Sequence, residues 1–243
     1  MNEISPWMGR SQLLMGDEHL LNLINANVII VGLGGVGGIC AEMMVRAGIS
    51  KLTIIDGDAV EETNRNRQIP ALISTDGVLK TEAMKNRLLD INPKLDLTMH
   101  SIYLTGEDNY SVLDAQKYDY AVDCIDTLSP KVYFILACLQ RKIPIVSSMG
   151  AGGRIDPCKV KIADLSKTIN CNLAKYVRKR LGKLGVKKGV KCVFSPEFID
   201  DTKVIPTPEE MRKKSIIGTI SYMPAVFGCT MASVVIRDLA YKS

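Results

Sequence analysis

The sequence predicts an α/β fold in which a doubly wound, mostly parallel sheet carries helices on both faces. The first reason is that short apolar runs rich in β-branched residues alternate with segments of helical periodicity. The second is the order of features in residues 28–58, where a strand, a glycine turn, a helix, a second strand and an acidic residue follow one another. A nucleotide-binding βαβ unit has this order, so we expect a Rossmann-like fold.

The βαβ unit begins with a buried strand at 28–31 and passes through a glycine turn into a helix at 39–47. The turn has G-x-G-x-x-G spacing with two further glycines, and its predicted nucleotide contacts are Gly32, Gly34, Gly35 and Gly37. Glycines let the backbone approach a phosphate, and the helix N-terminus offers free N–H groups. After the strand at 51–55, Asp56 is placed to accept hydrogen bonds from ribose hydroxyls. The alternative is a turn with a purely structural role.

Further elements follow from the same patterns, within a single domain of residues 1–243. Helices are expected at 17–25, 79–91, 130–141 and 172–185, and strands at 94–100, 119–124, 143–147 and 159–163. A charged, proline-containing linker is expected at 203–216. The domain then divides into an N-terminal helical arm (1–26), a nucleotide-binding core (27–163), a basic crossover segment (164–216) and a C-terminal core helix (217–243).

The C-terminal part and the cysteines bear on the cellular compartment. Residues 215–236 carry no charge and are long enough to span a bilayer, but glycine, proline, serine and threonine lower their apolarity. We therefore expect a buried core helix rather than a membrane segment. The N-terminus has no basic segment leading into an apolar stretch, so no secretory signal is expected. Seven scattered cysteines favour reduced thiols, and we expect a cytoplasmic protein.

Positive charge is concentrated in one segment. Residues 165–196 hold nine basic residues and no acidic one, and without them the net charge of +5 becomes −4. Leucine and valine recur at helical spacing in 172–185 with cations between them, which predicts an amphipathic basic helix. We expect this segment to contact nucleic acid, the alternative being a solvated surface helix. The candidate contacts are Lys175, Arg178, Lys179, Arg180, Lys183, Lys187 and Lys188.

Two cations beyond the βαβ unit favour ATP as the nucleotide. Arg67 lies in NRNRQ (64–68), and Lys80 follows thirteen residues later. The pyrophosphate of a dinucleotide would not need two such cations. A triphosphate carries more negative charge, which two cations would offset. The only histidines, His19 and His100, lie in no obvious catalytic loop. The site is therefore suited to ATP rather than to hydride transfer.

With these residues the chain resembles the adenylating superfamily of ubiquitin-activating enzymes and of the molybdopterin and thiamine sulfur-carrier adenylyltransferases (the ThiF, MoeB and HesA type). The matching features are Arg10, GLGGVG (32–37), IDGD (55–58), Asn64, Arg67, Lys80 and DCID (123–126). The second half is most similar to the tRNA threonylcarbamoyladenosine dehydratases, on the stretches NRNRQIPAL (64–72), INPK (91–94), GAGGRIDP (150–157), ADLSKTI (163–169) and KCVFSPE (191–197).

The resemblance implies an ATP-dependent enzyme that adenylates the carboxylate of threonylcarbamoyladenosine in tRNA and cyclises it. It also implies that Asp56 holds the ribose, that Asn64 and Arg67 orient the phosphates, and that Lys80 neutralises charge at the α-phosphate. Asp58 is expected in the nucleotide site and Asp126 on Mg²⁺, with Arg67, Lys80 and Asp126 as the catalytic residues. Arg10 is expected on the terminal phosphates, across a homodimer. For each of these charged residues the alternative is a surface ion pair.

The cysteines and the partners distinguish branches of the superfamily. Sulfur-carrier adenylyltransferases commonly hold zinc on two CxxC pairs, whereas the two nearest cysteines here, Cys158 and Cys171, are thirteen apart, so no zinc is expected. Cys192 is a candidate thioester nucleophile, the alternative being a packed thiol. Sulfur-transfer proteins are candidate partners. Two other functions stay open: adenylation of a carrier protein's C-terminus, and a non-catalytic nucleotide-binding adaptor.

Overall fold

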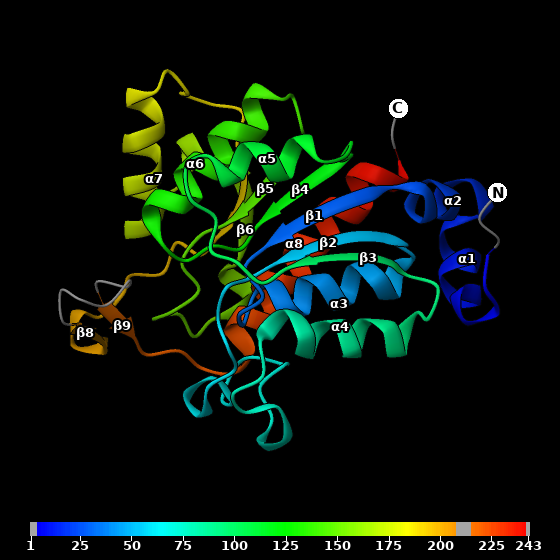
Figure 1. Ribbon diagram of the computed structural model, residues 1–243. Helices are drawn as coiled ribbons and strands as arrows, with labels where there is room; N and C mark the ends of the chain where they lie inside the picture. The colour runs from blue at the N-terminus through cyan, green and yellow to red at the C-terminus, as the bar shows by residue number, and fades with distance from the viewer. Residues whose placement is uncertain (1–3, 208–214, 242–243) are drawn as a thin grey trace.

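A computed structural model, which describes residues 4–207 and 215–241, contains a seven-stranded sheet of order β3-β2-β1-β4-β5-β7-β6 (Figure 1). Six strands are parallel, and β6 at one edge runs antiparallel to β7. The strands are β1 (Asn27–Val31), β2 (Lys51–Ile55), β3 (Asp96–His100), β4 (Tyr120–Asp123), β5 (Ile145–Ser148), β6 (Lys161–Asp164) and β7 (Lys191–Phe194). The doubly wound, mostly parallel α/β fold is thereby confirmed.

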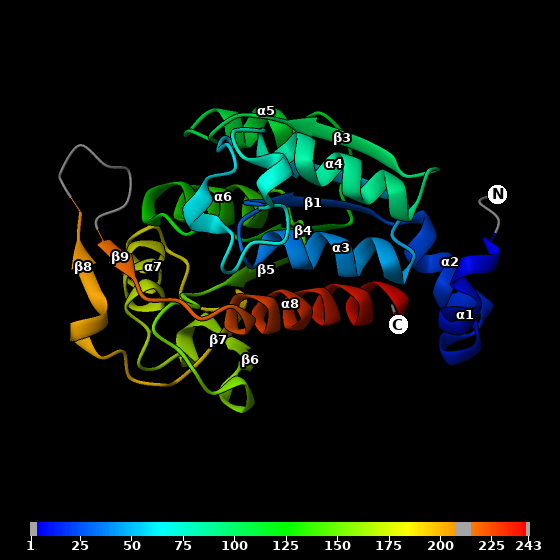
Figure 2. The same ribbon diagram turned by 90° about the horizontal axis from the view of Figure 1, so that it is seen from below.

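Helices cover both faces of the sheet (Figures 1 and 2). One face is covered by α3 (Gly37–Ala47), α4 (Lys80–Ile91) and α8 (Tyr222–Ala240), and the other by α5 (Asp108–Asp114), α6 (Leu128–Gln140) and α7 (Asn172–Lys183). The helices α1 (Gly9–Met15) and α2 (Asp17–Asn25) form an arm beside the N-terminal ends of the strands. Two hydrophobic cores result, one on each face of the sheet.

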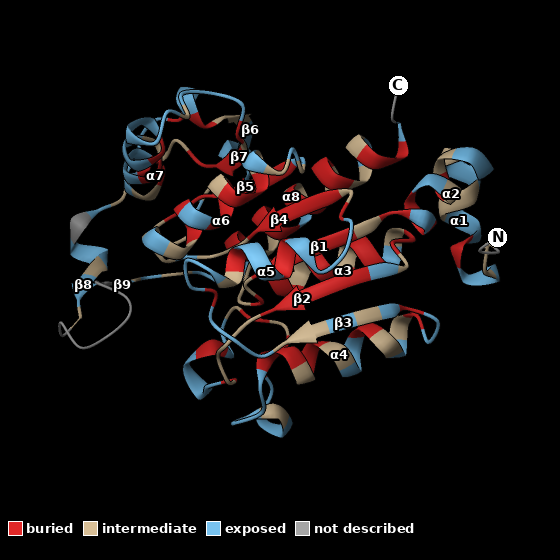
Figure 3. Ribbon diagram, turned by 45° about the horizontal axis from the view of Figure 1, so that its top comes forward, coloured by how far each residue is buried: buried red, intermediate tan, exposed pale blue. Residues whose placement is uncertain are grey.

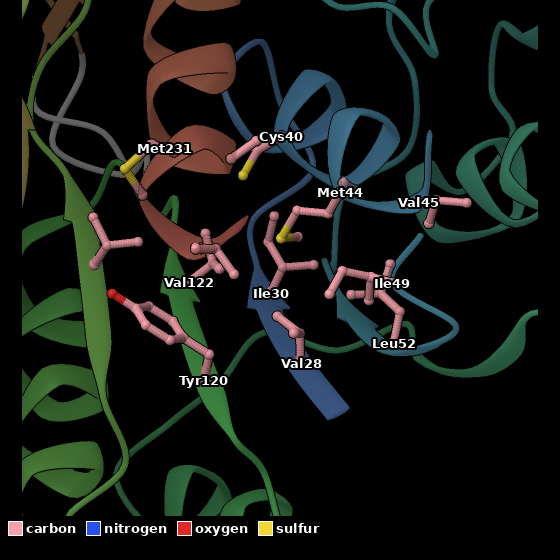
Figure 4. Close-up of a cluster of buried hydrophobic side chains, with 14 of the residues drawn as sticks. Val28, Ile30, Cys40, Met44, Val45, Ile49, Leu52, Tyr120, Val122 and Met231 are labelled. Carbon is pink, nitrogen blue, oxygen red and sulfur yellow. The ribbon is translucent and has the colours of Figure 1, made fainter. Parts of the chain in front are cut away.

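Side-chain alternation along β1 assigns its residues to the two cores. Val28 and Ile30 pack into the core under α3 and α8, while Ile29 and Val31 pack into the core under α5 and α6. In Figure 4, Ile30 lies close to Met44 of α3 in the first core. Burial on both faces explains the uninterrupted apolar run of this strand. The edge strand β3 is only partly buried (Figure 3), as its alternating sequence predicts.

The uncharged C-terminal segment forms α8, which is long and apolar enough to cross a membrane by length and composition. Its residues Met223, Phe227 and Met231 are fully buried in the first core. The contact with α3 is close, because a Cβ added at Gly228 would lie 2.5 Å from the Val36 carbonyl oxygen. The helix therefore packs in the core as expected.

Several elements differ from the sequence expectations. The strand expected at 159–163 is present as β6 but is antiparallel, and β7, α1 and α5 were not expected. The expected linker at 203–216 is wrong, because β8 (Val204–Pro206) and β9 (Ser215–Ile217) pair as antiparallel strands. The residues that join them, 208–214, lie outside the described part of the chain. These elements are short, so their hydrophobic residues do not repeat often enough for a helical or strand pattern to be recognised in the sequence.

We predict opposite effects for two glycine-to-alanine substitutions in helices. Gly228→Ala inserts a methyl group where α8 meets the α3 backbone, and we expect it to lower the free energy of unfolding by about 1–3 kcal/mol. Gly182→Ala in α7, where nothing lies within 4 Å of the added Cβ, should raise it by about 0.5–1 kcal/mol. Urea unfolding measures both, and equal effects of the two changes would contradict the close contact.

Candidate active site

The candidate site lies where the loops after β1, β2 and β4 meet, at the C-terminal ends of the central strands. Gly32 has a φ of +91°, and a Cβ there would lie 2.7 Å from the Cys124 carbonyl oxygen. A Cβ at Gly37 would lie 1.7 Å from the Gly32 oxygen. These two glycines are therefore required by the turn itself, which presses against the end of β4.

Gly34 has a different environment. A Cβ built on it would have as its nearest neighbours the side-chain amide atoms of Gln68, at 3.8–4.0 Å. Gln68 is buried, and its Oε1 has no hydrogen-bond partner within the described structure. A buried acceptor without a partner is costly, and a donor from a bound ligand would satisfy it. Gln68 was not among the predicted site residues, although its place directly after Arg67 was a signal for it.

Asp56 connects two loops of the site. Its carboxylate accepts hydrogen bonds from the backbone N–H of Leu33, at 2.6 Å, and from that of Asp58, at 2.8 Å. Burial raises the pKa of this carboxyl group, and the nearby Lys80 ammonium opposes the rise. Each carboxylate oxygen can accept a second hydrogen bond, so the predicted contact with ribose hydroxyls is compatible with this geometry.

Lys80 and Asp58 form an ion pair at the start of α4. The Lys80 Nζ donates to Asp58 Oδ2 at 2.8 Å, and the lysine side chain is only 6% exposed against 43% for the aspartate. The other carboxylate oxygen, Oδ1, accepts a hydrogen bond from the hydroxyl of Tyr103 at 2.5 Å. Tyr103 was not predicted, and its place shortly after β3 was the only signal for it.

Asn64 and Arg67 lie in the loop between β2 and α4. Asn64 is buried, and its Oδ1 contacts the Glu61 N–H at 3.4 Å. Arg67 is half-buried and donates through Nη1 to the Thr63 carbonyl at 2.9 Å and to Asn66 Oδ1 at 2.8 Å. The structure thus brings both predicted residues to the same loop as Gln68.

Asp126 lies in the loop that follows β4. The last residue of that strand, Asp123, forms a fully buried ion pair. Lys131 Nζ donates to Asp123 Oδ2 at 2.6 Å and to the Ser147 hydroxyl at 3.2 Å, while Asp123 Oδ1 accepts from the Ile125 N–H. Both charged side chains of the pair are 0% exposed. The pair therefore fixes the backbone that presents the exposed carboxylate of Asp126.

A magnesium site fits the chemistry of these residues. Among the described residues, no group of three or more His, Cys, Asp or Glu side chains could hold a metal ion. Mg²⁺ does not need such a group, since it is usually bound by one or two carboxylates together with substrate phosphates and waters. The exposed carboxylate of Asp126, in the loop after β4, is an oxygen ligand of the kind that such a site requires. The expectation that zinc is absent stays a prediction.

Arg10 does not lie with the other predicted residues. It is exposed on α1, beside the N-terminal ends of the strands, whereas the glycine turn follows their C-terminal ends (Figure 2). An Arg10 contact with the nucleotide of its own chain is therefore excluded by the length of the sheet.

The basic helix α7 has one face in the core and one in solvent. Most of the predicted nucleic-acid contacts are exposed, namely Lys175, Lys179, Arg180, Lys183, Lys187 and Lys188. Arg178 differs, because its Nη1 donates to the Leu165 and Thr168 carbonyls and to the Thr168 hydroxyl. Its side chain anchors the helix to the preceding loop, which argues against the predicted RNA contact at this position.

A buried arginine joins the segments around α7. Arg154, in the glycine-rich loop after β5, is 1% exposed and donates to the backbone carbonyls of Glu197 and Asn170. Glu197 in turn accepts from the N–H groups of Ile155 and Asp156. These bonds fix the start of the basic segment against the ends of β5 and β7.

Cys192 is not placed as a nucleophile. It is fully buried on β7, and burial raises the pKa of its thiol to about 12. A buried thiol that stays protonated at neutral pH cannot attack an acyl-adenylate. The structure therefore favours the packed thiol over the predicted nucleophile.

Comparison with known proteins shows the family of this chain. The ThiF family model matches residues 9–242. The tRNA threonylcarbamoyladenosine dehydratase of Bacillus subtilis is 38% identical over 237 residues, which cover 95% of this chain and 93% of the relative. The adenylyltransferase and sulfurtransferase MOCS3 of Drosophila yakuba is 34% identical, but the match covers only 56% of this chain and 30% of the relative.

Among solved structures, the Escherichia coli tRNA N6-threonylcarbamoyladenosine dehydratase, TcdA, in complex with ATP has a TM-score of 0.89 and 35% identity, covering 99% of this chain and 98% of the other. The same enzyme in complex with AMP also has a TM-score of 0.89. Fold and site together define a Rossmann-like enzyme of the nucleotide-binding class. The chain belongs to the ThiF family, in its group of tRNA threonylcarbamoyladenosine dehydratases.

Thiol accessibility tests the assignment of Cys192. We predict that in the native protein iodoacetamide alkylates the exposed Cys158 at least about 100-fold faster than Cys192, because the thiolate of Cys192 is suppressed and shielded. Mass spectrometry of timed samples measures both rates, and the two thiols should react alike in urea. Comparable native rates would restore Cys192 as a candidate nucleophile.

Proposed function

We propose that this protein is an ATP-dependent dehydratase that adenylates the carboxylate of threonylcarbamoyladenosine in tRNA and cyclises it to cyclic threonylcarbamoyladenosine. The observation that carries the proposal is the similarity over nearly the whole chain to dehydratases of this name, one of them solved with ATP. The arrangement of the glycine turn, Asp56, Lys80 and Asp126 at one edge of the sheet supports ATP as the co-substrate.

The proposed reaction has two steps. A carboxylate oxygen of the substrate attacks the α-phosphorus of ATP, pyrophosphate leaves, and an acyl-adenylate forms. The ureido nitrogen of the same nucleoside then attacks the acyl carbon and loses its proton, so that a ring closes and AMP leaves. The nucleoside loses one water overall. Because the second step is intramolecular, the protein mainly has to position the groups and exclude water.

Each site residue has a role in this scheme. Asp56 holds the ribose hydroxyls, while Asn64, Arg67 and the backbone of the glycine turn bind the phosphates. Lys80 stabilises charge that develops at the α-phosphate. Asp126 would hold Mg²⁺, which supplies charge neutralisation on the phosphates when bound. Gln68 adds an acceptor for a ligand donor beside the turn.

The basic segment provides the surface for tRNA. Its exposed cations, which exclude Arg178, follow the solvent face of α7 and the residues just after it. Phosphate contacts of this kind dominate the affinity of nucleic-acid binding. All seven cysteines are free, which supports a reducing compartment, and we place the enzyme in the cytoplasm. Sulfur-transfer proteins as partners stay a prediction of the resemblance.

A homodimer would bring Arg10 to a nucleotide site. Arg10 lies far from its own site, so its contact with the terminal phosphates requires the site of a second copy of the chain. The arm that carries Arg10 also exposes the apolar side chains of Trp7, Leu13 and Leu14. Exposed apolar residues of this kind are typical of surfaces that become buried on association.

Substitution of Lys80 tests the proposed function. With ATP, Mg²⁺ and tRNA carrying threonylcarbamoyladenosine, the protein should remove one water from the nucleoside, as measured by mass spectrometry. Lys80→Ala should lower the rate at least about 100-fold, because a cation at the transferred phosphoryl group is lost. The control Lys85→Ala, from a surface pair with Glu82 on the same helix, should stay within about twofold of wild type.

Two results would contradict this proposal in different ways. Unchanged nucleoside mass together with adenylation of a carrier protein's C-terminus would replace the dehydratase with a carrier-protein adenylyltransferase. Turnover that is unaffected by Lys80→Ala would keep the reaction but remove Lys80 from the mechanism.

Mixing of subunits tests the role of Arg10. If each site combines Lys80 of one chain with Arg10 of its partner, Arg10→Ala and Lys80→Ala proteins should each be inactive. After subunit exchange, half of the dimers are mixed and each has one intact site, so about a quarter of wild-type activity should return. A monomer in sedimentation analysis, or no recovery after exchange, would contradict the shared site.

A further inference from the structure

We propose that Tyr103 is a positioning residue of the adenylation site, which acts through Asp58 on Lys80. This inference rests on the proposed function, in which Lys80 serves the α-phosphate. Tyr103 belongs to the loop between β3 and α5 and is not part of any motif identified in the sequence. The side chain contacts the site from an element that contributes no other predicted residue.

The carboxylate of Asp58 is shared between two donors. Its Oδ2 accepts from Lys80 Nζ at 2.8 Å, and its Oδ1 accepts from the Tyr103 hydroxyl at 2.5 Å. The Asp58 side chain is 43% exposed, so burial alone does not fix its orientation. A short hydrogen bond to an ionised carboxylate is strong and directional. The hydrogen bond from Tyr103 therefore restricts the rotation of the Asp58 carboxylate, which faces Lys80.

The ring of Tyr103 is held by packing, in addition to the hydrogen bond of its hydroxyl. A Cβ added at Gly57 would lie 2.6 Å from ring carbons of Tyr103. The ring thus packs directly on the backbone between Asp56 and Asp58, a contact that only glycine permits at this position. A tyrosine that was simply exposed at the surface would not need this space.

The consequence for Lys80 is both electrostatic and geometric. Its ammonium is nearly buried, so a partner that offsets its charge is required. Because the carboxylate cannot rotate, the ammonium stays in one position before ATP binds. This preorganisation should affect the chemical step more than the binding of ATP.

Tyr103→Phe tests the proposal because it keeps the ring and removes only the hydroxyl. We expect the single-turnover rate of AMP formation to fall about tenfold, while the KM for ATP stays within about twofold. The control is Tyr110→Phe, which removes a hydroxyl on α5 that donates a hydrogen bond to Gln140 of α6. This variant should leave the rate of AMP formation unchanged. An equal loss in both variants would overturn the proposal, and so would a loss expressed only in KM.

Gly57→Ala supplies an independent perturbation of the same contact. The backbone at Gly57 has no positive φ, so alanine is tolerated there except for its approach to the Tyr103 ring. It should lower the rate as Tyr103→Phe does, and the double variant should lie within about twofold of the slower single variant, since both changes disrupt one contact. Effects that multiply would show that the two residues act separately and would overturn the proposal.

A measurement without substrate separates this inference from the proposed function. Acetic anhydride labels lysine amines, and mass spectrometry gives the rate at Lys80 in the protein alone. Asp58→Asn removes the anionic partner of Lys80, so Lys80 should be acetylated fastest in that variant. In Tyr103→Phe the acetylation rate of Lys80 should be several times the wild-type rate but below that of Asp58→Asn. If the wild type converts no tRNA but this order holds, the proposed function falls and the positioning of Lys80 stands. An unchanged Lys80 rate in Tyr103→Phe overturns the inference whatever the turnover.

Discussion

The close approach of the glycine turn to the end of β4 is the constraint on which the site depends. Gly32 and Gly37 leave no room for a side chain, because the turn contacts both itself and the Cys124 carbonyl. With the turn in this position, the N–H of Leu33 reaches the carboxylate of Asp56, and the loops after β1 and β2 become one unit. The ends of three strands are thereby fixed before any ligand binds, which is the preorganisation that phosphoryl chemistry needs.

The buried pair of Lys131 and Asp123 stabilises the opposite side of the same site. Two fully buried charges are costly to desolvate, and the pair is tolerated because Ser147 and the Ile125 N–H complete its hydrogen bonds. These contacts link α6, β4 and β5 underneath the loop that carries Asp126. Removal of either charge alone would leave the other unpaired in the core, so both partners are needed to keep this arrangement of strand ends.

Local patterns predicted the parts of the fold and site that are encoded locally. The strand, turn and helix of residues 27–47 follow from apolar runs and glycine spacing, and Asp56, Asn64, Arg67 and Lys80 follow from their positions relative to strand ends. Contacts between distant residues could not be predicted in this way. The antiparallel direction of β6 depends on pairing with β7 some thirty residues later, and Arg178 turns inward because of carbonyl groups ten to thirteen residues away. The contact between Tyr103 and Asp58 spans 45 residues and leaves no periodic trace.

The packing of α8 has a consequence for the way in which the glycine turn is supported. Its first turns lie against the glycine turn and the start of α3, since added Cβ atoms at Gly35 and Gly228 would meet Pro224 and the Val36 oxygen respectively. The glycine turn and α8 lie far apart in the sequence, so this support is a long-range contact of the folded chain. Local sequence sets the shape of the turn, whereas its support depends on a helix from the other half of the chain. A change that displaces α8 should therefore disturb the glycine turn, although no residue of α8 belongs to the predicted site.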